Sequence, residues 1–449
     1  WDRHLEYILT CSSFVVGIKN ILQFPTLTAK NGGGAFYFVY LLLVCILGVP
    51  ILYLEMCIGQ YVHGGPMKAW TVMPLAKGLG YGMLVLCTLI SMFYNTYSAW
   101  ALFYLFSSFS STLPWEANQA DWDIHTSIQF CIYSCSEDML DISSGLGDTG
   151  QVQPYIAGCL FLTWVVVGVA VYWGRISVGK VAYVTGTLPA VLFLAIFSGV
   201  ITLPGAVSGV KMFLTPKWQV LGKPQIWLDG VLIVLTSMGC GTGGIINLSG
   251  YCHFHSGCFR NAVLTGISNV MGCTLAGCSM FAILGVYTQI IQQPINTFNI
   301  SETEIGFHLF PAISFYLENS AVWSAIFYLS IFTTGIGTQI VFISTVYTGF
   351  SQLIGVHTTL WKISSLVFLL SVLYLIGLTT VTQAGLFVIT YLDEFIHKLS
   401  IPIFCLLECL IITWVYGAQR FHNKVADMTG SSEGPFIKWM WKVICPVFL

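Results

Sequence analysis

Long apolar segments alternate with short polar ones along almost the whole chain. Each long segment reaches the roughly 20 residues that a helix needs to cross the hydrocarbon core of a bilayer. The predicted spans are residues 5–29, 35–60, 80–110, 155–173, 178–202, 227–250, 260–290, 321–350, 360–380 and 385–416. Another apolar helix starts near Trp439, and residues 436–449 are interpreted as the start of an eleventh span. The pattern predicts an all-α integral membrane protein in a lipid bilayer.

Two of these spans are interrupted by residues that disfavour a continuous helix. The first contains Gly17-Ile18-Lys19-Asn20 and then Phe24-Pro25, and the sixth reads Gly-Cys-Gly-Thr-Gly-Gly over residues 239–244. Each glycine inside a helix costs about 1 kcal/mol relative to alanine, so four within six positions favour an unwound segment over close helix packing. Broken spans at corresponding positions of two halves are typical of inverted-repeat transporters, in which freed carbonyls bind cations.

These breaks predict a single transmembrane domain, 1–449, built from a first inverted repeat, 1–202, and a second, 227–416. Both repeats would contain five helices and would surround a polar site near the middle of the membrane. The chain opens without Met and closes on an apolar run. Both ends are therefore expected to be cut.

Composition and charge agree with this prediction, and the charges also predict how the chain is oriented in the membrane. Only 8% of the residues are charged, against roughly 25% in soluble proteins. Segments 111–154 and 290–320 contain acidic residues but no Lys or Arg, and they alternate with basic loops. The positive-inside rule places these two segments outside and the N-terminus in the cytosol. Loop 203–226, with three lysines, departs from the pattern.

Two modifications are expected in the outside segments. Asn299-Ile300-Ser301 matches the N-glycosylation signal. Cys131 and Cys135 lie where a disulfide is chemically permitted, and whether they pair with each other stays open.

Other broad classes of function are not expected. The chain has no nucleophile–base motif and no metal-spaced His/Cys set, and residues 239–244 lack the Lys-Ser/Thr ending of a phosphate loop. It also lacks the basic patch of a nucleic-acid-binding protein. Neither an enzyme nor a nucleic-acid partner is predicted.

A series of short motifs then narrows the prediction. The most specific is Asn31-Gly32-Gly33-Gly34-Ala35-Phe36, and the others are Phe24-Pro25, Gly48-Val49-Pro50, Glu55, Gly59-Gln60-Tyr61, Tyr94-Asn95-Thr96, Ala99-Trp100-Ala101-Leu102, Leu113-Pro114-Trp115, Tyr251-Cys252-His253-Phe254 and Trp414-Val415-Tyr416-Gly417. Taken in chain order, these motifs resemble those of the neurotransmitter:sodium symporters (solute carrier family 6) over essentially the whole chain. The resemblance implies the leucine-transporter-type fold, about twelve spans and sodium-coupled transport across the plasma membrane.

The resemblance also implies two sodium sites. Ligands of the first would be the carbonyl of Val15 and the side chains of Asn20, Ser237 and Asn269. All the oxygens that a hard cation needs are present. Alternatively, the two asparagines only hydrogen-bond the unwound backbone.

The second sodium site and the chloride site are less complete. The second sodium site would use the carbonyls of Ser13, Val16 and Thr334 and the hydroxyl of Thr338, but Gly337 stands where the family has another side-chain oxygen. Of the chloride ligands, Tyr53 and Ser237 are present, whereas Ile233 replaces a Gln and Cys273 replaces a Ser. Sodium is therefore the expected ion, and chloride dependence is not supported.

The implied substrate site also contains an unusual lysine. Its residues would be Gly17, Ile18, Lys19, Tyr94, Thr236, Ser237 and Gly239. Lys19 replaces a glycine, and three interpretations stay open: it reaches into a water-filled vestibule, its charge substitutes for a sodium ion, or it blocks the pocket. Gly17 stands where monoamine carriers have Asp, which favours a small zwitterionic, amino-acid-like substrate.

The outer gate has changed as well. Gln23 replaces the family's Arg, while Asp393 retains the acidic partner. The expected charge-assisted pair is thereby reduced to a neutral hydrogen bond at best. Asp393, Glu394, His397 and Lys398 form a charged cluster that is interpreted as solvated vestibule lining rather than a substrate contact.

Two functions are consistent with these residues. The first is a secondary active transporter that moves a small zwitterion with sodium. The second is a member that has lost transport and serves as a structural subunit with protein partners in a membrane complex, because the altered positions gather in the transport machinery while the packing motifs remain. Fold alone does not decide between them.

Overall fold

The computed structural model describes residues 1–110, 145, 147, 149–292, 304–355, 358–430 and 435–449. The α-helices are α1 (His4–Val15), α2 (Ile18–Ile21), α3 (Gln23–Lys30), α4 (Gly34–Leu43), α5 (Val49–Val62), α6 (Pro66–Ala69), α7 (Lys77–Ser107), α9 (Pro154–Tyr172), α10 (Arg175–Val200), α11 (Ala206–Leu214), α12 (Pro224–Ser237), α13 (Gly244–Ser249), α14 (Cys258–Ile291), α15 (Phe310–Ser314), α16 (Ser320–Ile354), α17 (Thr359–Gly377), α18 (Gly385–Phe395), α19 (Ile401–Leu410), α20 (Ala418–Thr429), α21 (Pro435–Trp439) and α22 (Cys445–Phe448). Five π-helical segments join or precede some of them: Val44–Gly48, Glu304–Leu309, Ile396–Ser400, Ile411–Gly417 and Met440–Ile444. Helices thus account for the predicted all-α architecture.

Within the described residues, eight helices are long and apolar enough to cross a membrane. Seven of them coincide closely with predicted spans. The last one runs from Gly385 to Thr429 and thus includes α20, which follows the predicted end at residue 416. Gly417 has a φ of 101°, and at this residue the chain turns into the polar helix α20.

The first predicted span is broken, as its sequence indicates. The pair α1 and α2–α3 is bent by 57°. Gly17 lies in the break because a side chain does not fit: a Cβ there would lie 2.8 Å from the Tyr94 hydroxyl and 3.0 Å from the Thr338 hydroxyl. The backbone amide of Ile18, the first residue of α2, donates to the Tyr94 Oη at 2.7 Å. The break therefore brings backbone polar groups against α7 and α16.

The sixth predicted span is also broken, between α12 and α13. Gly239, Gly241 and Gly243 all have positive φ, between 65° and 78°, which glycine adopts without steric cost. The ring of Phe14 fills the space beside them, since a Cβ at Gly239 would lie 2.4 Å from a ring carbon. The amide of Gly241 donates to the Glu55 carboxylate at 2.7 Å. Buried side chains thus fix the unwound segment.

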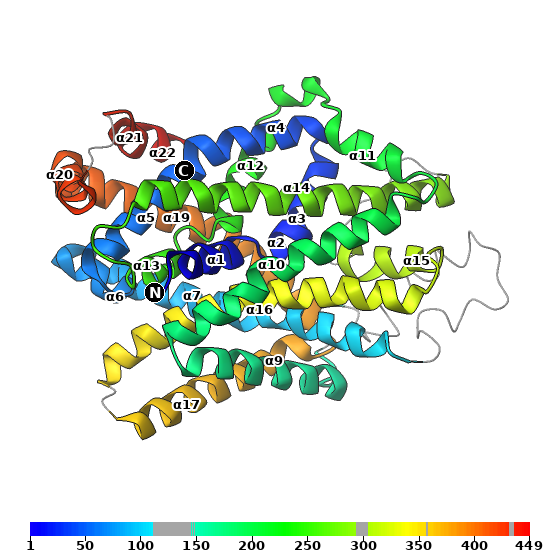
Figure 1. Cartoon of the computed structure of the whole chain (residues 1–449), viewed down its shortest axis with the longest axis horizontal. Helices are drawn as coiled ribbons and strands as arrows, with labels where there is room; N and C mark the ends of the chain where they lie inside the picture. The colour runs from blue at the N-terminus through cyan, green and yellow to red at the C-terminus, as the bar shows by residue number, and fades with distance from the viewer. Residues whose placement is uncertain (111–144, 146, 148, 293–303, 356–357, 431–434) are drawn as a thin grey trace.

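The long helices run side by side in one bundle, with the connecting elements at its two ends (Figure 1). The N-terminus, α6 and α20 lie at one end, and α11 and α15 lie at the other. The long helix α16 packs along α7 and α10, and α11 packs on α14. Helix α11 lies in the segment 203–226, which the sequence analysis treated only as a loop. The two breaks lie in the interior of this bundle.

Candidate functional site

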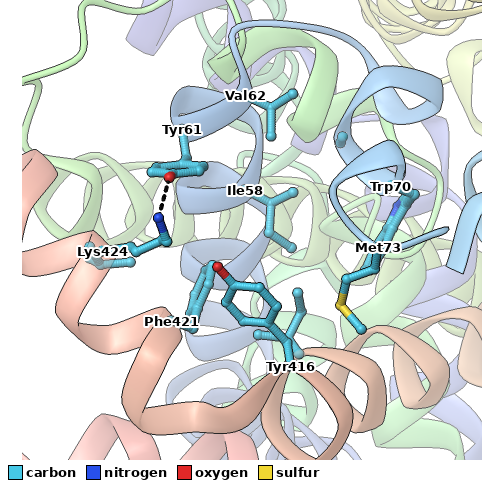
Figure 2. A pocket seen from close by; sticks show the side chains of 11 residues that line it. Ile58, Tyr61, Val62, Trp70, Met73, Tyr416, Phe421 and Lys424 are labelled. Carbon is cyan, nitrogen blue, oxygen red and sulfur yellow. Dashed lines mark hydrogen bonds between the residues drawn. The ribbon is translucent and has the colours of Figure 1, made fainter. Parts of the chain in front are cut away.

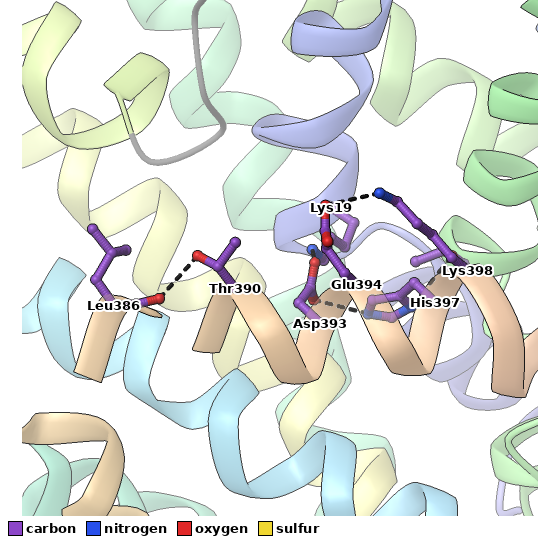
Figure 3. Close-up of polar contacts among 8 residues, drawn as sticks. Lys19, Leu386, Thr390, Asp393, Glu394, His397 and Lys398 are labelled. Atoms are coloured by element: carbon purple, nitrogen blue, oxygen red, sulfur yellow. Dashed lines mark hydrogen bonds and ion pairs between the residues drawn. The ribbon is translucent and has the colours of Figure 1, made fainter. Parts of the chain in front are cut away.

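A buried ion pair connects the first broken span with α18. The Lys19 Nζ lies 2.5 Å from the Asp393 Oδ2, and the two residues are 5% and 7% exposed. The Lys19 ammonium also lies 6.0 Å from the centre of the Tyr97 ring. In Figure 3 Lys19 projects from the broken span toward the carboxylate of Asp393. Asp393 thus compensates the charge of Lys19.

This pair corrects the expectation for the outer gate. The interaction of Asp393 is not a neutral hydrogen bond, because Lys19 supplies a cation in place of the missing Arg. The Gln23 Oε1 is buried and has no hydrogen-bond partner among the described residues. The sequence contained a signal for this exchange: positions 19 and 23 are four residues apart and therefore lie on the same face of a helix.

The charged cluster on α18 and the following π-helical turn divides into a buried and an exposed half (Figure 3). His397 is buried, and its Nε2 lies 3.1 Å from the Asp393 Oδ1. Its Nδ1 lies 3.3 Å from the hydroxyl of Thr236 on α12. Glu394 and Lys398, by contrast, form an exposed pair at 2.8 Å. The expectation of a solvated lining is therefore wrong for Asp393 and His397.

A cluster of polar side chains adjoins both breaks. The Asn20 side chain donates to the Asn269 Oδ1, and the Asn269 Nδ2 donates to the Ser237 Oγ at 3.1 Å. The Asn20 Oδ1 accepts from the Gly17 amide at 3.2 Å. These side chains come from α2, α14 and the end of α12, and all are buried. Val15 is the last residue of α1, so its carbonyl lies at the break.

A different tyrosine from the expected one contacts this cluster. The Tyr40 Oη accepts from the Asn269 Nδ2 at 3.0 Å and donates to the Cys273 Sγ at 3.2 Å. Tyr53 instead stacks on Trp441 at 5.2 Å and packs edge-on against Phe259. Tyr40 was therefore not among the residues predicted for this site. It could have been found only from its position four residues after the Asn-Gly-Gly-Gly-Ala-Phe motif.

The residues expected at the second sodium site also gather at the first break. The Thr338 hydroxyl lies 3.4 Å from the Ser13 carbonyl and 3.4 Å from the Thr334 carbonyl. Val16 lies between α1 and Gly17. A Cβ at Gly337 would lie 2.2 Å from the Ser13 Oγ. Position 337 therefore has no room for a side chain while Ser13 keeps this position.

At the end of the bundle that holds the N-terminus, Trp1 contacts α13 and the connection that follows it. The Trp1 Nε1 donates to the Leu248 carbonyl at 3.2 Å, and its ring lies edge-on to Tyr251 at 6.3 Å. Cys252 follows in the connection between α13 and α14 and is buried, and burial raises the pKa of its thiol to about 12.

Two hollows lie away from the predicted substrate residues. One lies between α5, α6 and α20, encloses about 40 Å³, and has apolar walls with Lys424 bonded to Tyr61 at 2.7 Å at its edge (Figure 2). The other is an apolar groove of about 520 Å³ between α9 and α17. Neither is lined by a residue of the predicted substrate site.

The structure does not describe the three residues that are expected to be modified. Asn299, Cys131 and Cys135 lie outside the described residues. Glycosylation and the disulfide therefore stay predictions from the sequence.

Comparison with known proteins identifies the chain's relatives. The family model described as the sodium:neurotransmitter symporter family matches residues 1–449. The chain belongs to this family. Relatives at 30% identity include the sodium- and chloride-dependent glycine transporter 1 of Xenopus laevis, the sodium- and chloride-dependent GABA transporter 2 of Rattus norvegicus and the creatine transporter of Torpedo marmorata. These alignments cover 99–100% of this chain and 76–78% of the relatives.

Membership in the sodium:neurotransmitter symporter family confirms the resemblance and the all-α membrane fold. The protein is an integral membrane protein of a family of symporters. The Lys19–Asp393 pair and the burial of His397 are contacts that the sequence motifs of this chain did not indicate. The motifs predicted the two breaks, and the pairing across the bundle became visible only in three dimensions.

Proposed function

We propose that this chain is a sodium-coupled symporter of the plasma membrane that carries a small, amino-acid-like zwitterion. The polar cluster of Asn20, Ser237 and Asn269 carries this proposal, because it places uncharged oxygens from both broken spans in one buried position. The names of the relatives support it, since glycine, GABA and creatine are all small solutes with a carboxylate.

The donor set fits a sodium ion. Hard cations take oxygen ligands such as carbonyls and amide oxygens, and the cluster offers the Asn20 Oδ1, the Asn269 Oδ1 and the Ser237 Oγ beside the carbonyl of Val15. The described residues contain no group of three or more His, Cys, Asp or Glu side chains that could hold a metal ion. Uncharged oxygens suit a monovalent cation that must be released again.

The substrate is proposed to bind at the break between α1 and α2. Gly17 leaves no acidic group there, and the Ile18 amide and the Tyr94 hydroxyl lie beside it. The N-terminal ends of half-helices favour an anionic group such as a substrate carboxylate. Thr236, Ser237 and Gly239 would complete the site from the other broken span. Because the carboxylate of Asp393 compensates the charge of Lys19, the lysine does not present an unpaired positive charge to the substrate.

The orientation and the repeat structure are also proposals. The N-terminus and the basic helix α20 lie at the same end of the bundle (Figure 1), which supports a cytosolic N-terminus. The breaks within residues 1–202 and 227–416 support two repeats that face each other across the site.

Loss of transport is the less favoured alternative. The relatives named above are transporters, and the altered residue Lys19 has a partner rather than an uncompensated charge. Neither observation points to a purely structural subunit.

Uptake into proteoliposomes tests the proposal. Full-length protein is supplied with labelled glycine, GABA, creatine and a wider amino-acid panel, with an inward sodium gradient or with choline. We expect sodium-driven uptake of at least one solute, and a loss of it in Asn269→Ala. Thr274→Ala on the same helix serves as the control. Correctly folded wild-type protein that takes up none of the panel with sodium would argue for the subunit function instead.

A further inference from the structure

A second group of oxygens lies at the first break, around Ser13 and Gly337. We propose that the Ser13 hydroxyl is a ligand of a monovalent cation at this point and supplies the oxygen that Gly337 cannot. The ligand would thus lie on α1 rather than on α16. This inference rests on the sodium coupling proposed above and adds the identity of one of its ligands.

The geometry at Gly337 indicates this exchange. A Cβ at Gly337 would lie 2.2 Å from the Ser13 Oγ, and 3.1 Å from the Thr185 Cβ. The hydroxyl of Ser13 therefore already occupies the space into which a side chain at position 337 would project. A side chain at position 337 would therefore displace the Ser13 hydroxyl, and in this chain the hydroxyl comes from α1.

A second hydroxyl contacts that of Ser13, and further oxygens gather around Thr338, which follows Gly337 in the chain. The Ser13 Oγ lies 2.9 Å from the Thr185 Oγ1 on α10. The Thr338 Oγ1 lies 3.3–3.4 Å from the carbonyls of Ser13, Phe14 and Thr334. The four hydroxyl-bearing residues are all buried. The group combines carbonyls with hydroxyls, which are ligands for a hard cation.

The absence of charge among these ligands selects the cation. None of these oxygens belongs to a carboxylate, whereas calcium and magnesium ions in proteins are bound with carboxylates. A monovalent cation such as sodium is the class that fits. The cation would connect α1 and α16. Thr185 on α10 would be a positioning residue, because its hydroxyl orients that of Ser13.

Sodium binding measured on purified full-length protein tests the assignment. The readout is the melting temperature at increasing NaCl, with choline chloride keeping the ionic strength constant, and binding of labelled sodium in parallel. Ser13→Ala keeps the Cβ and removes only the hydroxyl. We expect its sodium midpoint to rise about tenfold, as for the loss of roughly 1.4 kcal/mol of binding free energy. Ser13→Gly should show the same rise.

Moving the hydroxyl provides the decisive comparison. Ser13→Gly combined with Gly337→Ser puts the hydroxyl back on α16 and removes the clash, so we expect a midpoint close to that of the wild type. Gly337→Ser alone should weaken sodium binding, because its side chain meets Ser13. A wild-type midpoint in Ser13→Ala, or no gain when Gly337→Ser is added to Ser13→Gly, would overturn the proposal. Wild-type protein without any sodium response would instead contradict the proposed coupling itself.

Discussion

The ammonium of Lys19 and the carboxylate of Asp393 lie 2.5 Å apart, although 374 residues separate them in the chain. Both are almost fully buried. Charges removed from water carry a large desolvation cost, which a close partner offsets. The pair therefore explains how a lysine is tolerated in a membrane-spanning segment, and it makes each residue depend on the other.

Breaking this pair from one side should destabilise the protein. Asp393→Asn leaves the Lys19 ammonium buried without a full counter-charge, and we expect a loss of roughly 3–5 kcal/mol. The combination with Lys19→Met should recover much of this loss, because no uncompensated charge remains. Thermal unfolding in detergent measures both. Glu394→Gln, in the exposed neighbouring pair, is the matched control and should change little. Equal losses in the single and double variants would show that the two charges are not coupled.

The family's expected gate arrangement can be restored by moving the cation. Lys19→Gly with Gln23→Arg shifts the positive charge by four residues on the same helical face. We expect the double variant to be more stable than Lys19→Gly alone and to show at least as much uptake. Lys19→Gly with Gln23→Leu is the control, since it changes both positions without adding a charge. Indistinguishable double variants would mean that residue 23 does not reach Asp393.

Gly17 should not tolerate even one methyl group. The Cβ of Gly17→Ala would lie 2.8 Å from the Tyr94 hydroxyl, which is held by the Ile18 amide. Overpacking of this kind costs about 1–3 kcal/mol, and we expect uptake to fall. Adding Tyr94→Phe removes the obstructing oxygen and should restore part of the stability. Tyr94→Phe alone shows what losing the hydrogen bond contributes. If the double variant is no better than Gly17→Ala, the obstruction lies elsewhere.

Chloride dependence should increase when the two altered residues are replaced. Tyr40, Ser237 and Asn269 bring hydroxyl and amide donors together. Ile233 adds no donor, and the thiol of Cys273 is a weak one. We expect Ile233→Gln with Cys273→Ser to respond to chloride at lower concentration than the wild type, measured as uptake with chloride replaced by gluconate. An unchanged response to chloride would show that positions 233 and 273 do not take part in anion binding.

The thiol of Cys252 should react slowly with maleimide while the protein is folded. Its pKa is raised to about 12 by burial, so at neutral pH the reactive thiolate is scarce. Unfolding in guanidinium chloride removes this burial and should lower the pKa toward its ordinary value, which increases the rate of maleimide labelling. Mass spectrometry of the labelled peptides measures the rate in the folded and in the unfolded protein. Equal labelling rates in the two states would show that this thiol is not buried.

The sequence predicted the elements well because their causes are local. The glycines at 239–244 and the apolar lengths of the spans act over a few residues, and the structure contains both breaks and the long helices. The predicted end of the last span at residue 416 lies next to the turn at Gly417, whereas the polar helix α20 that follows was not predicted.

The contacts across the bundle were harder to predict. Lys19 and Asp393 are far apart in the chain, and only the fold of the whole bundle brings their side chains together. Tyr40 and Tyr53 lie on the same predicted span, and hydropathy does not distinguish a tyrosine that faces the polar cluster from one that packs on Trp441. The burial of His397 likewise depends on neighbours from other helices.

The paired charges on α2 and α18 would also respond to the electric field across the membrane if a gate at this position opened by separating them. While the two charges stay together, their sum is zero and the field exerts no net force on the pair. Movement of one helix relative to the other along the membrane normal would carry each charge through part of the field, which is worth roughly 2.3 kcal/mol per elementary charge for a full crossing at 100 mV. The rate of gate opening should therefore depend on voltage, and a neutral gate residue such as Gln23 would contribute nothing to that dependence.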